Sequence, residues 1–299
     1  MSALSTGLVA WLRLLRPPNL PTVPGDPIAG LVLALGAGGA WDIRALWVVM
    51  AALAIYAGGL ILNDVADYGI DRRERPGRPL PSGAVGRPLA LAAGLALGVA
   101  GIALASLAGL PALVAACILS ALVLIYDFIM PRGSFAGIIV MGLCRAMSVG
   151  LGIAAAGDLS WNRGMPWLAA AGTGLYIAAV SLIAAGEMDA MRVGRLRWLP
   201  LAVLLAVMGL MVVSSAGFSW SGALLAAIPV LAAWNLGRRL GPAPAPAAVP
   251  PTIGGYIRVL VLMQAAYCAM APWPGPAAPV ILLCMWPISA IVSKRFYAS

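Results

Sequence analysis

The 299-residue chain contains no histidine, a single lysine and only ten acidic residues. Without histidine there is no imidazole to act as a general base or a metal ligand, and Ser-His-Asp catalysis is excluded. Charged residues make up 10% of the sequence and hydrophobic residues 62%, whereas a soluble domain carries roughly 25% charged residues. This balance is typical of a protein that crosses a lipid bilayer several times.

Cysteine is also scarce, and its spacing excludes the usual cysteine sites. Cys117, Cys144, Cys268 and Cys284 lie in apolar segments and show no C-x-x-C spacing. We therefore expect them to be buried small hydrophobic residues rather than disulfide partners or metal ligands.

Ten apolar runs, bounded by glycine, proline or charge, are long enough for membrane helices of about 20 residues. We expect spans over residues 20–39, 43–63, 88–108, 111–130, 134–157, 166–186, 198–215, 219–236, 254–272 and 277–293. The last two could instead form one helix and an interfacial piece. Helices are required because an open sheet would leave backbone groups unpaired in lipid. The expected fold is an all-α polytopic transmembrane helix bundle, with nine or ten membrane spans around a central cavity, in one domain over residues 1–299.

Basic residues concentrate on one side of this predicted bundle. Fifteen lie in one set of loops and ends, against Arg44 and Arg163 in the other: Arg13, Arg16, Arg72, Arg73, Arg75, Arg78, Arg87, Arg132, Arg192, Arg195, Arg197, Arg238, Arg239, Lys294 and Arg295. The positive-inside rule places the fifteen in the cytoplasm, with the protein in the cell (inner) membrane. The same rule accounts for the net charge of +9, so we expect the lipid bilayer, and no nucleic acid, as a partner.

The acidic residues gather on this same side. Seven of the ten fall at predicted cytoplasmic helix ends: Asp64, Asp67, Asp71, Glu74, Asp127, Glu187 and Asp189. Acids in or beside a membrane helix are costly and usually face a cavity, a partner or an ion.

Three of these acids predict a metal site. On a helix, Asp64, Asp67 and Asp71 stand at i, i+3 and i+7, which places them on one face. Such hard oxygen ligands suit Mg²⁺, which shares its other positions with water and substrate phosphates. With arginines clamping the remaining phosphate oxygens, the combination predicts diphosphate chemistry inside a membrane.

The run from Asn63 to Asp71 reads NDxxDxxxD, and Arg75-Pro-Gly-Arg78-Pro-Leu-Pro-Ser82-Gly83 follows it. This pattern resembles the signature of the UbiA superfamily of intramembrane prenyltransferases. The runs Leu15–Asn19 and Tyr126-Asp127 resemble that family as well. The resemblance implies a Mg²⁺-dependent enzyme that ionises a polyprenyl diphosphate donor and transfers the prenyl group to a hydrophobic acceptor, either lipid-soluble or aromatic.

Site roles follow from the motif together with this resemblance. We expect Asp64, Asp67 and Asp71 to hold Mg²⁺ and Asn63 to orient a carboxylate or the diphosphate. Candidate phosphate clamps are Arg16, Arg72, Arg78 and Arg132. The π-face of Tyr126 is a candidate to stabilise the developing cation.

The second acidic motif departs from the family pattern. The family has a DxxxD-type run here, whereas this chain has Glu187 and Asp189 only two residues apart, about 200° apart on a helix. One of the two, with Asp189 the first choice, would hold a second metal ion or deprotonate the acceptor. The lysine that often follows the family's tyrosine is replaced nearby by Arg132. These departures resemble a divergent, EboC-like branch.

Three other functions remain as alternatives. A UbiA-type terpene cyclase needs the same ionisation but no acceptor. A phosphatidyl-type transferase would have a D-G-x-x-A-R element, which Asp67–Arg72 lacks. A transporter would have acids near mid-membrane and inverted repeats, and the sequence indicates neither.

Overall fold

The structure is a computed structural model. It describes residues 3–36, 42–131, 133–157, 164–186, 190–215, 220–271 and 277–295. The N-terminal half consists of α1 (Ala3–Leu15), η1 (Leu20–Thr22), α2 (Gly25–Leu35), α3 (Ile43–Ala66), α4 (Tyr68–Glu74), α5 (Arg87–Ser106), α6 (Leu110–Phe128) and α7 (Phe135–Ala155). The C-terminal half consists of α8 (Gly164–Ala185), α9 (Ala190–Leu196), α10 (Leu199–Ser214), α11 (Trp220–Leu240), η4 (Pro246–Ala248), α12 (Val249–Met270) and α13 (Ala277–Arg295).

These elements form the expected all-helical, multi-pass membrane bundle. Within the described residues, eight helices are long and apolar enough to cross a bilayer, and α13 contains a shorter apolar stretch, Ala277–Ser293. Each predicted span coincides with one of these helices or with α2. α12 begins at Val249, five residues before the predicted start, because Pro250 and Pro251 occupy first-turn positions whose N–H groups need no partner.

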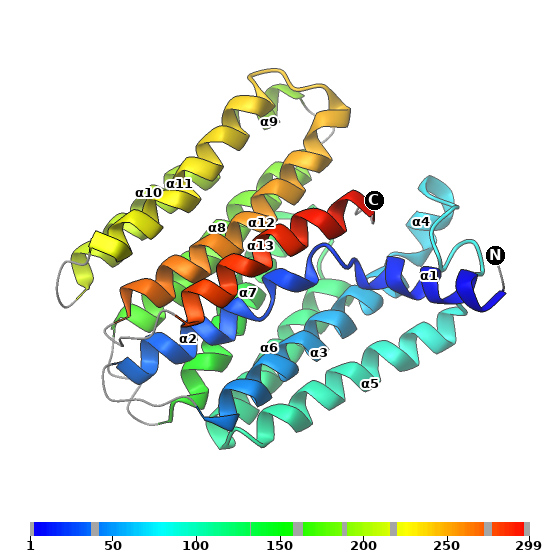
Figure 1. The fold of residues 1–299 in the computed structure, drawn as a ribbon. Coiled ribbons are helices and arrows are strands. Elements are labelled where there is room, and N and C mark those ends of the chain that lie inside the picture. Colours follow the sequence, from blue (N-terminus) through cyan, green and yellow to red (C-terminus); the bar gives the residue numbers. More distant parts are fainter. Residues whose placement is uncertain are drawn as a thin grey trace.

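The first predicted span, residues 20–39, is the one that differs most from the structure. Its regular helix covers only the eleven residues of α2, and η1 precedes it. Pro21 and Pro24 lack backbone N–H groups, so a regular helix can start only after them. α1, η1 and α2 therefore follow one another as a broken helix (Figure 1).

The helices form two groups joined by a central layer. α3 packs against α5 and α6, while α8 packs against α10, and α7 contacts α2, α6 and α8 between them. α12 packs against α11, α13, α2 and α8 and is the most buried of the long helices. α1, α4 and the end of α13 lie at the same end of the bundle (Figure 1).

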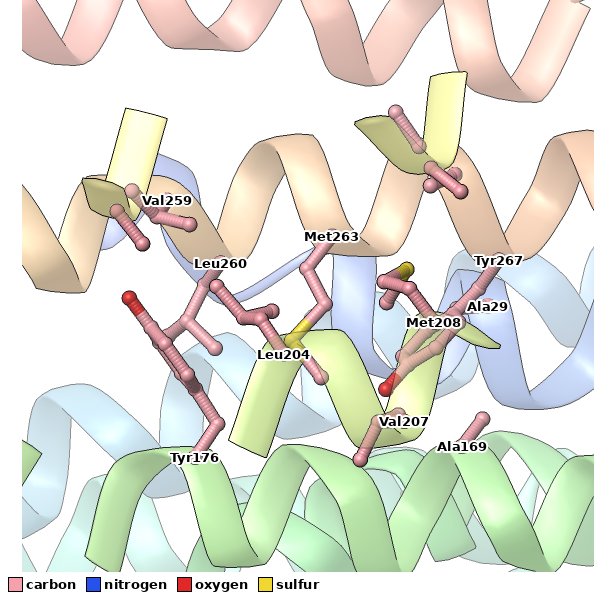
Figure 2. Close-up of a cluster of buried hydrophobic side chains, with 14 of the residues drawn as sticks. Ala29, Ala169, Tyr176, Leu204, Val207, Met208, Val259, Leu260, Met263 and Tyr267 are labelled. Atoms are coloured by element: carbon pink, nitrogen blue, oxygen red, sulfur yellow. The ribbon is translucent and has the colours of Figure 1, made fainter. Parts of the chain in front are cut away.

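The largest apolar core surrounds α12. Leu260, Met263 and Tyr267 of α12 interdigitate with Tyr176 of α8 and Leu204 of α10 (Figure 2). Tyr176 and Tyr256 are both fully buried, and the Tyr176 hydroxyl donates a hydrogen bond to the Tyr256 carbonyl at 2.7 Å. This core fixes the C-terminal half of the bundle around one helix.

All four cysteines are free. The expected burial holds for Cys268, whereas Cys117 and Cys284 are exposed on α6 and α13 and Cys144 is half-buried on α7. In a membrane helix an apolar position can face lipid as well as the core, so hydropathy alone does not predict burial.

Candidate functional site

The predicted metal-binding aspartates lie where α3 ends. α3 stops at Ala66, and Asp67 joins it to α4 with ψ −1°. Hydrogen bonds of 2.9 Å, from the Asp67 N–H to the Asn63 carbonyl and from the Asp71 N–H to the Asp67 carbonyl, continue across this junction. The single continuous helix assumed for this motif is therefore wrong, because a turn interrupts it at Asp67. Asp64 and Asp71 still face a common point.

That common point is a guanidinium group. Arg78 Nη1 lies 2.6 Å from Asp71 Oδ2 and 3.7 Å from Asp64 Oδ1. Arg16 Nη2 lies 2.8 Å from the same Asp64 oxygen. The side chains of Asp64 and Asp71 are only 7% and 1% exposed, so these are charge pairs with little screening by water. The four residues form one alternating cluster of two carboxylates and two arginines.

Arg16 is brought to this cluster by a strained backbone. It is the one described non-glycine residue with a positive φ, 44°. Such a conformation costs about 1–3 kcal/mol and persists only when surrounding contacts hold it. The following segment provides those contacts, because Ser289 Oγ of α13 donates a hydrogen bond to the Pro18 carbonyl at 2.7 Å.

A second polar contact connects α3 with α6. Asn63 Nδ2 donates a hydrogen bond of 3.1 Å to Asp127 Oδ1, and Asp127 Oδ2 is buried without a hydrogen-bond partner among the described residues. Asp127 also lies within electrostatic range of Asp67, Asp64 and Arg16. Asp127 was not among the predicted catalytic, diphosphate-binding or metal residues. Its position at the end of an apolar run, next to Tyr126, was the available signal.

The remaining predicted site residues divide into two groups. Arg72 is exposed on α4. Arg132, Glu187 and Asp189 lie outside the described residues. The structure thus brings together Arg16, Asn63, Asp64, Asp71 and Arg78, with Asp67 and Tyr126 beside them.

The residues present fit a Mg²⁺ site of a particular kind. Over the described part of the chain, no three acidic or cysteine side chains come close enough to hold an ion by themselves. Mg²⁺ is usually held by one or two carboxylates and fills its other positions with water and phosphate oxygens. Asp64 and Asp71, with Asp67 half-buried between the helices, match such an incomplete site.

A cavity of about 150 Å³ opens beside the cluster, between α3, α6 and α7. Arg16, Asn63, Tyr126 and Asp127 lie at its polar end. Apolar side chains line most of the rest: Ala52, Ile55, Leu60, Leu119, Val123 and Met141. A charged site that opens into an apolar cavity can bind an amphiphile with an anionic head.

An ion pair inside the bundle includes Arg145, one of the residues that line this cavity. Arg145 Nη1 donates a hydrogen bond of 2.7 Å to Asp26 Oδ2, and Arg145 Nη2 donates one of 2.8 Å to Thr22 Oγ1. Gln264 Nε2 donates to Asp26 Oδ1 at 2.6 Å and to the Thr22 carbonyl at 2.8 Å. Asp26 is fully buried and Arg145 is 6% exposed.

This ion pair corrects the expectation that no acid lies near mid-membrane. The available signal was Arg145 itself, a lone arginine inside an apolar run, because such a charge needs a counter-ion within the bundle. Since the pair joins α2 to α7 and α12, it also fixes the segment that carries Arg16.

Comparisons with known proteins agree with this geometry. The model of the UbiA prenyltransferase family matches residues 27–249. The digeranylgeranylglyceryl phosphate synthase of Methanoculleus marisnigri is 32% identical over 197 residues, which cover 65% of this chain and 68% of that protein. The next two relatives of the same name are matched over 50% and 38% of their lengths.

Solved structures share the fold. A UbiA homologue from Aeropyrum pernix superimposes with a TM-score of 0.65 at 20% identity, over 83% of this chain and 96% of that one. A UbiA homologue from Archaeoglobus fulgidus bound to GPP and Mg²⁺ gives a TM-score of 0.57 at 13% identity, over 87% and 99%. The helical bundle, the NDxxDxxxD run beside its cavity and the match over residues 27–249 agree, and the chain belongs to the UbiA prenyltransferase family.

Proposed function

We propose that this membrane enzyme ionises an isoprenoid diphosphate with the help of Mg²⁺ and transfers the prenyl group to a hydrophobic acceptor. The observation that carries the proposal is the position of the Arg16–Asp64–Arg78–Asp71 cluster beside an apolar cavity inside the bundle. The cluster suits a diphosphate and the cavity suits an isoprenoid chain, so one amphiphilic donor can occupy both. The Archaeoglobus relative bound to GPP and Mg²⁺ supports this choice.

The acidic residues and the arginines would have complementary roles. Asp64, Asp67 and Asp71 would hold Mg²⁺, which as a Lewis acid neutralises the charge that grows on the leaving diphosphate. Arg16 and Arg78 would turn from the carboxylates to the phosphate oxygens, where a planar guanidinium can bind two oxygens at once.

Bond breaking would then take place at the polar end of the cavity. The allylic C–O bond ionises, its electron pair leaves with the diphosphate, and a carbocation remains facing the cavity. Tyr126, which lines this end, can stabilise the cation through its π-face. The apolar wall would keep water from capturing the cation before the acceptor does.

The acceptor must lose a proton after its bond to the prenyl carbon forms. Asp189 or Glu187 is proposed as the base, or as ligand to a second metal ion, on the basis of the second motif. If no acceptor is required, the same ionisation makes a terpene cyclase, and product analysis separates the two activities.

We place the diphosphate site at the cytoplasmic end of an inner-membrane protein. The excess of fifteen basic residues over two on the side of Asp64 and α4 supports this orientation. A cytoplasmic site would receive a water-soluble diphosphate head directly from the cytosol.

Purified protein should release diphosphate from isoprenoid diphosphates when Mg²⁺ is present and stop when EDTA is added. Asp64→Ala and Asp67→Ala should each lower this rate by orders of magnitude. Asp42→Ala is the matched control, because Asp42 forms an exposed pair with Arg44 at the start of α3, the end of that helix remote from the cluster. A membrane extract supplied as acceptor source should yield a prenylated product by mass spectrometry. Near-normal release by Asp67→Ala at saturating Mg²⁺ would overturn the metal assignment.

A further inference from the structure

Arginines gather at one corner of the bundle, where α9 leads into α10 and α11 ends. Gly194 of α9 packs so closely on the carbonyl of Pro242, just after α11, that an added Cβ atom would overlap it. Gly237 of α11 lies in close contact with the Trp198 ring, which directly precedes α10. The basic side chains of this corner, called the arginine corner below, are Arg195, Arg197, Arg238 and Arg239.

Two of these arginines lie over tryptophan rings. The guanidinium carbon of Arg197 lies 5.1 Å from the centre of the Trp198 ring, and that of Arg238 lies 4.8 Å from the centre of the Trp234 ring. Such a contact uses no N–H donor, so the donors of both guanidinium groups can still bind an anion. Since tryptophan is enriched where membrane helices meet the lipid head groups, the two pairs indicate that the corner lies at head-group level.

The arginine corner has no acidic partner within the described residues. Elsewhere the structure pairs arginines with aspartates, as it does for Arg16, Arg44, Arg78 and Arg145. Arg195, Arg238 and Arg239 are exposed, and Arg197 Nε is buried without a hydrogen-bond partner in the described part of the chain. A buried donor left without an acceptor is costly. An anion from outside the protein would therefore stabilise the corner.

The backbone that carries this charge is held by the core. The Tyr256 hydroxyl of α12 donates a hydrogen bond of 2.9 Å to the Arg197 carbonyl. Tyr256 itself is completely buried, and the Trp198 ring is held against Gly237. A ligand bound at this corner therefore has little backbone to order, which lowers the entropic cost of binding.

We propose that the arginine corner binds the phosphate head group of an anionic phospholipid in the leaflet at this end of the bundle. Phosphate fits because a guanidinium can donate two parallel hydrogen bonds to its oxygens, and basic pockets between membrane helices bind anionic head groups. The acyl chains would lie along α10 and α11, where apolar side chains such as Leu205 and Leu231 are exposed.

This lipid site goes beyond the proposed function and does not depend on it. None of the four arginines lines the cavity of the candidate site or belongs to the Arg16–Asp64–Arg78–Asp71 cluster. The lipid is a bound partner of the fold and is neither the donor nor the acceptor of the prenyl group.

The test measures which lipid the purified protein retains. The protein in detergent is mixed with equal amounts of phosphatidylglycerol and phosphatidylcholine that carry the same acyl chains, and bound lipid is counted by native mass spectrometry. We expect the native protein to retain phosphatidylglycerol at least tenfold over phosphatidylcholine. One arginine near a head group changes lipid affinity about fivefold, so Arg197→Gln with Arg238→Gln should bring this ratio close to one.

A matched control separates the site from total charge. Arg73→Gln with Arg75→Gln removes two exposed arginines at the end of α4 and should keep the native ratio. Arg197→Lys with Arg238→Lys keeps the charge but loses the planar fork, and should lower the ratio severalfold. Inorganic phosphate in excess should not displace the lipid, because it lacks the acyl chains.

The midpoint of thermal unfolding in lipid-free detergent shows that each variant is folded. A native ratio near one would overturn the inference. So would an equal loss in the α4 control, because the preference would then reflect total charge, and so would displacement by inorganic phosphate. Diphosphate release enters none of these measurements, so their outcome leaves the proposed function to be judged by its own test.

Discussion

At the scale of single residues, the Arg16–Asp64–Arg78–Asp71 cluster holds its own charges in balance. Arg16 and Arg78 sit against Asp64 and Asp71, so two positive charges offset two negative ones inside a bundle of low polarity. A site with unbalanced carboxylates at this depth would be costly to fold. The same arginines are therefore both the counter-ions of the free protein and the proposed ligands of the diphosphate.

Arg72 and Arg78 were both predicted from the sequence to bind phosphate. In the structure Arg78 contacts Asp71, whereas Arg72 is exposed. Arg78→Lys keeps the positive charge but loses the planar fork that can bind two oxygens. A hydrogen bond to a charged group is worth about 1.5–3 kcal/mol, so we expect KM for the donor to rise by about ten- to a hundred-fold. Arg72→Ala, at an exposed position on α4, should change KM less than twofold. Steady-state kinetics of diphosphate release checks both, and equal effects would contradict this ranking.

Residue patterns indicated all four residues of the cluster but not the polar contacts around it. Asp64 and Asp71 could be predicted to converge because their spacing of seven is local to the chain. The Asp26–Arg145 pair could not be found this way, since its partners are 119 residues apart and no local period relates them. The contact of Asp127 with Asn63 could not be predicted either, because it depends on how α6 packs against α3.

At the scale of helices, close backbone contact holds α2 against α7. Gly152 and Gly30 allow α7 and α2 to touch without intervening side chains, as small residues commonly do between membrane helices. At the C-terminal end of α3 the chain turns at Asp67, and α4 then leads toward Arg78. The turn at Asp67 is followed by the segment whose Arg78 contacts both Asp64 and Asp71.

Gly152→Ala should destabilise the protein because its methyl group would overlap the Pro27 carbonyl. Overpacking of this kind costs about 1–3 kcal/mol, and we expect a lower midpoint of thermal unfolding in detergent. Gly209→Ala on α10 is the control, since nothing lies within 4 Å of the added atom. A helical glycine replaced by alanine in open space gains about 0.5–1 kcal/mol. An unchanged midpoint for Gly152→Ala would show that α2 and α7 can separate freely.

At the scale of the whole molecule, hydropathy predicted the order and approximate bounds of the helices. α5 was expected at 88–108 and runs from Arg87 to Ser106, and α7 was expected at 134–157 and runs from Phe135 to Ala155. This works because every crossing helix must satisfy its own backbone in lipid, so its length is set by the bilayer. The predicted bounds of the first span were wrong because its prolines interrupt the helical backbone without lowering the hydropathy of the segment.

The charge bias predicts the sidedness of the entire bundle. Ser82 follows α4, while Ser106 ends α5, whose 20 residues correspond to about 30 Å, the thickness of the hydrocarbon core. In a background without native cysteines, Ser106→Cys should react with an impermeant thiol reagent in intact cells. Ser82→Cys should react only after the cells are opened. Labelling of Ser82→Cys in intact cells would reverse the orientation.

The distance in sequence between Asp26 and Arg145 also has a consequence for synthesis. Ribosomes add about 5–20 residues per second, so Arg145 is made roughly 6 to 24 s after Asp26, 119 residues earlier. During that interval α2 is a short apolar helix that carries an unmatched acid, and it cannot settle stably in lipid by itself. Chains arrested before Phe135 should leave Ala29→Cys open to aqueous thiol reagents, whereas finished chains, in which Ala29 is fully buried, should protect it. α2 would then reach its final place only after α7 has been made.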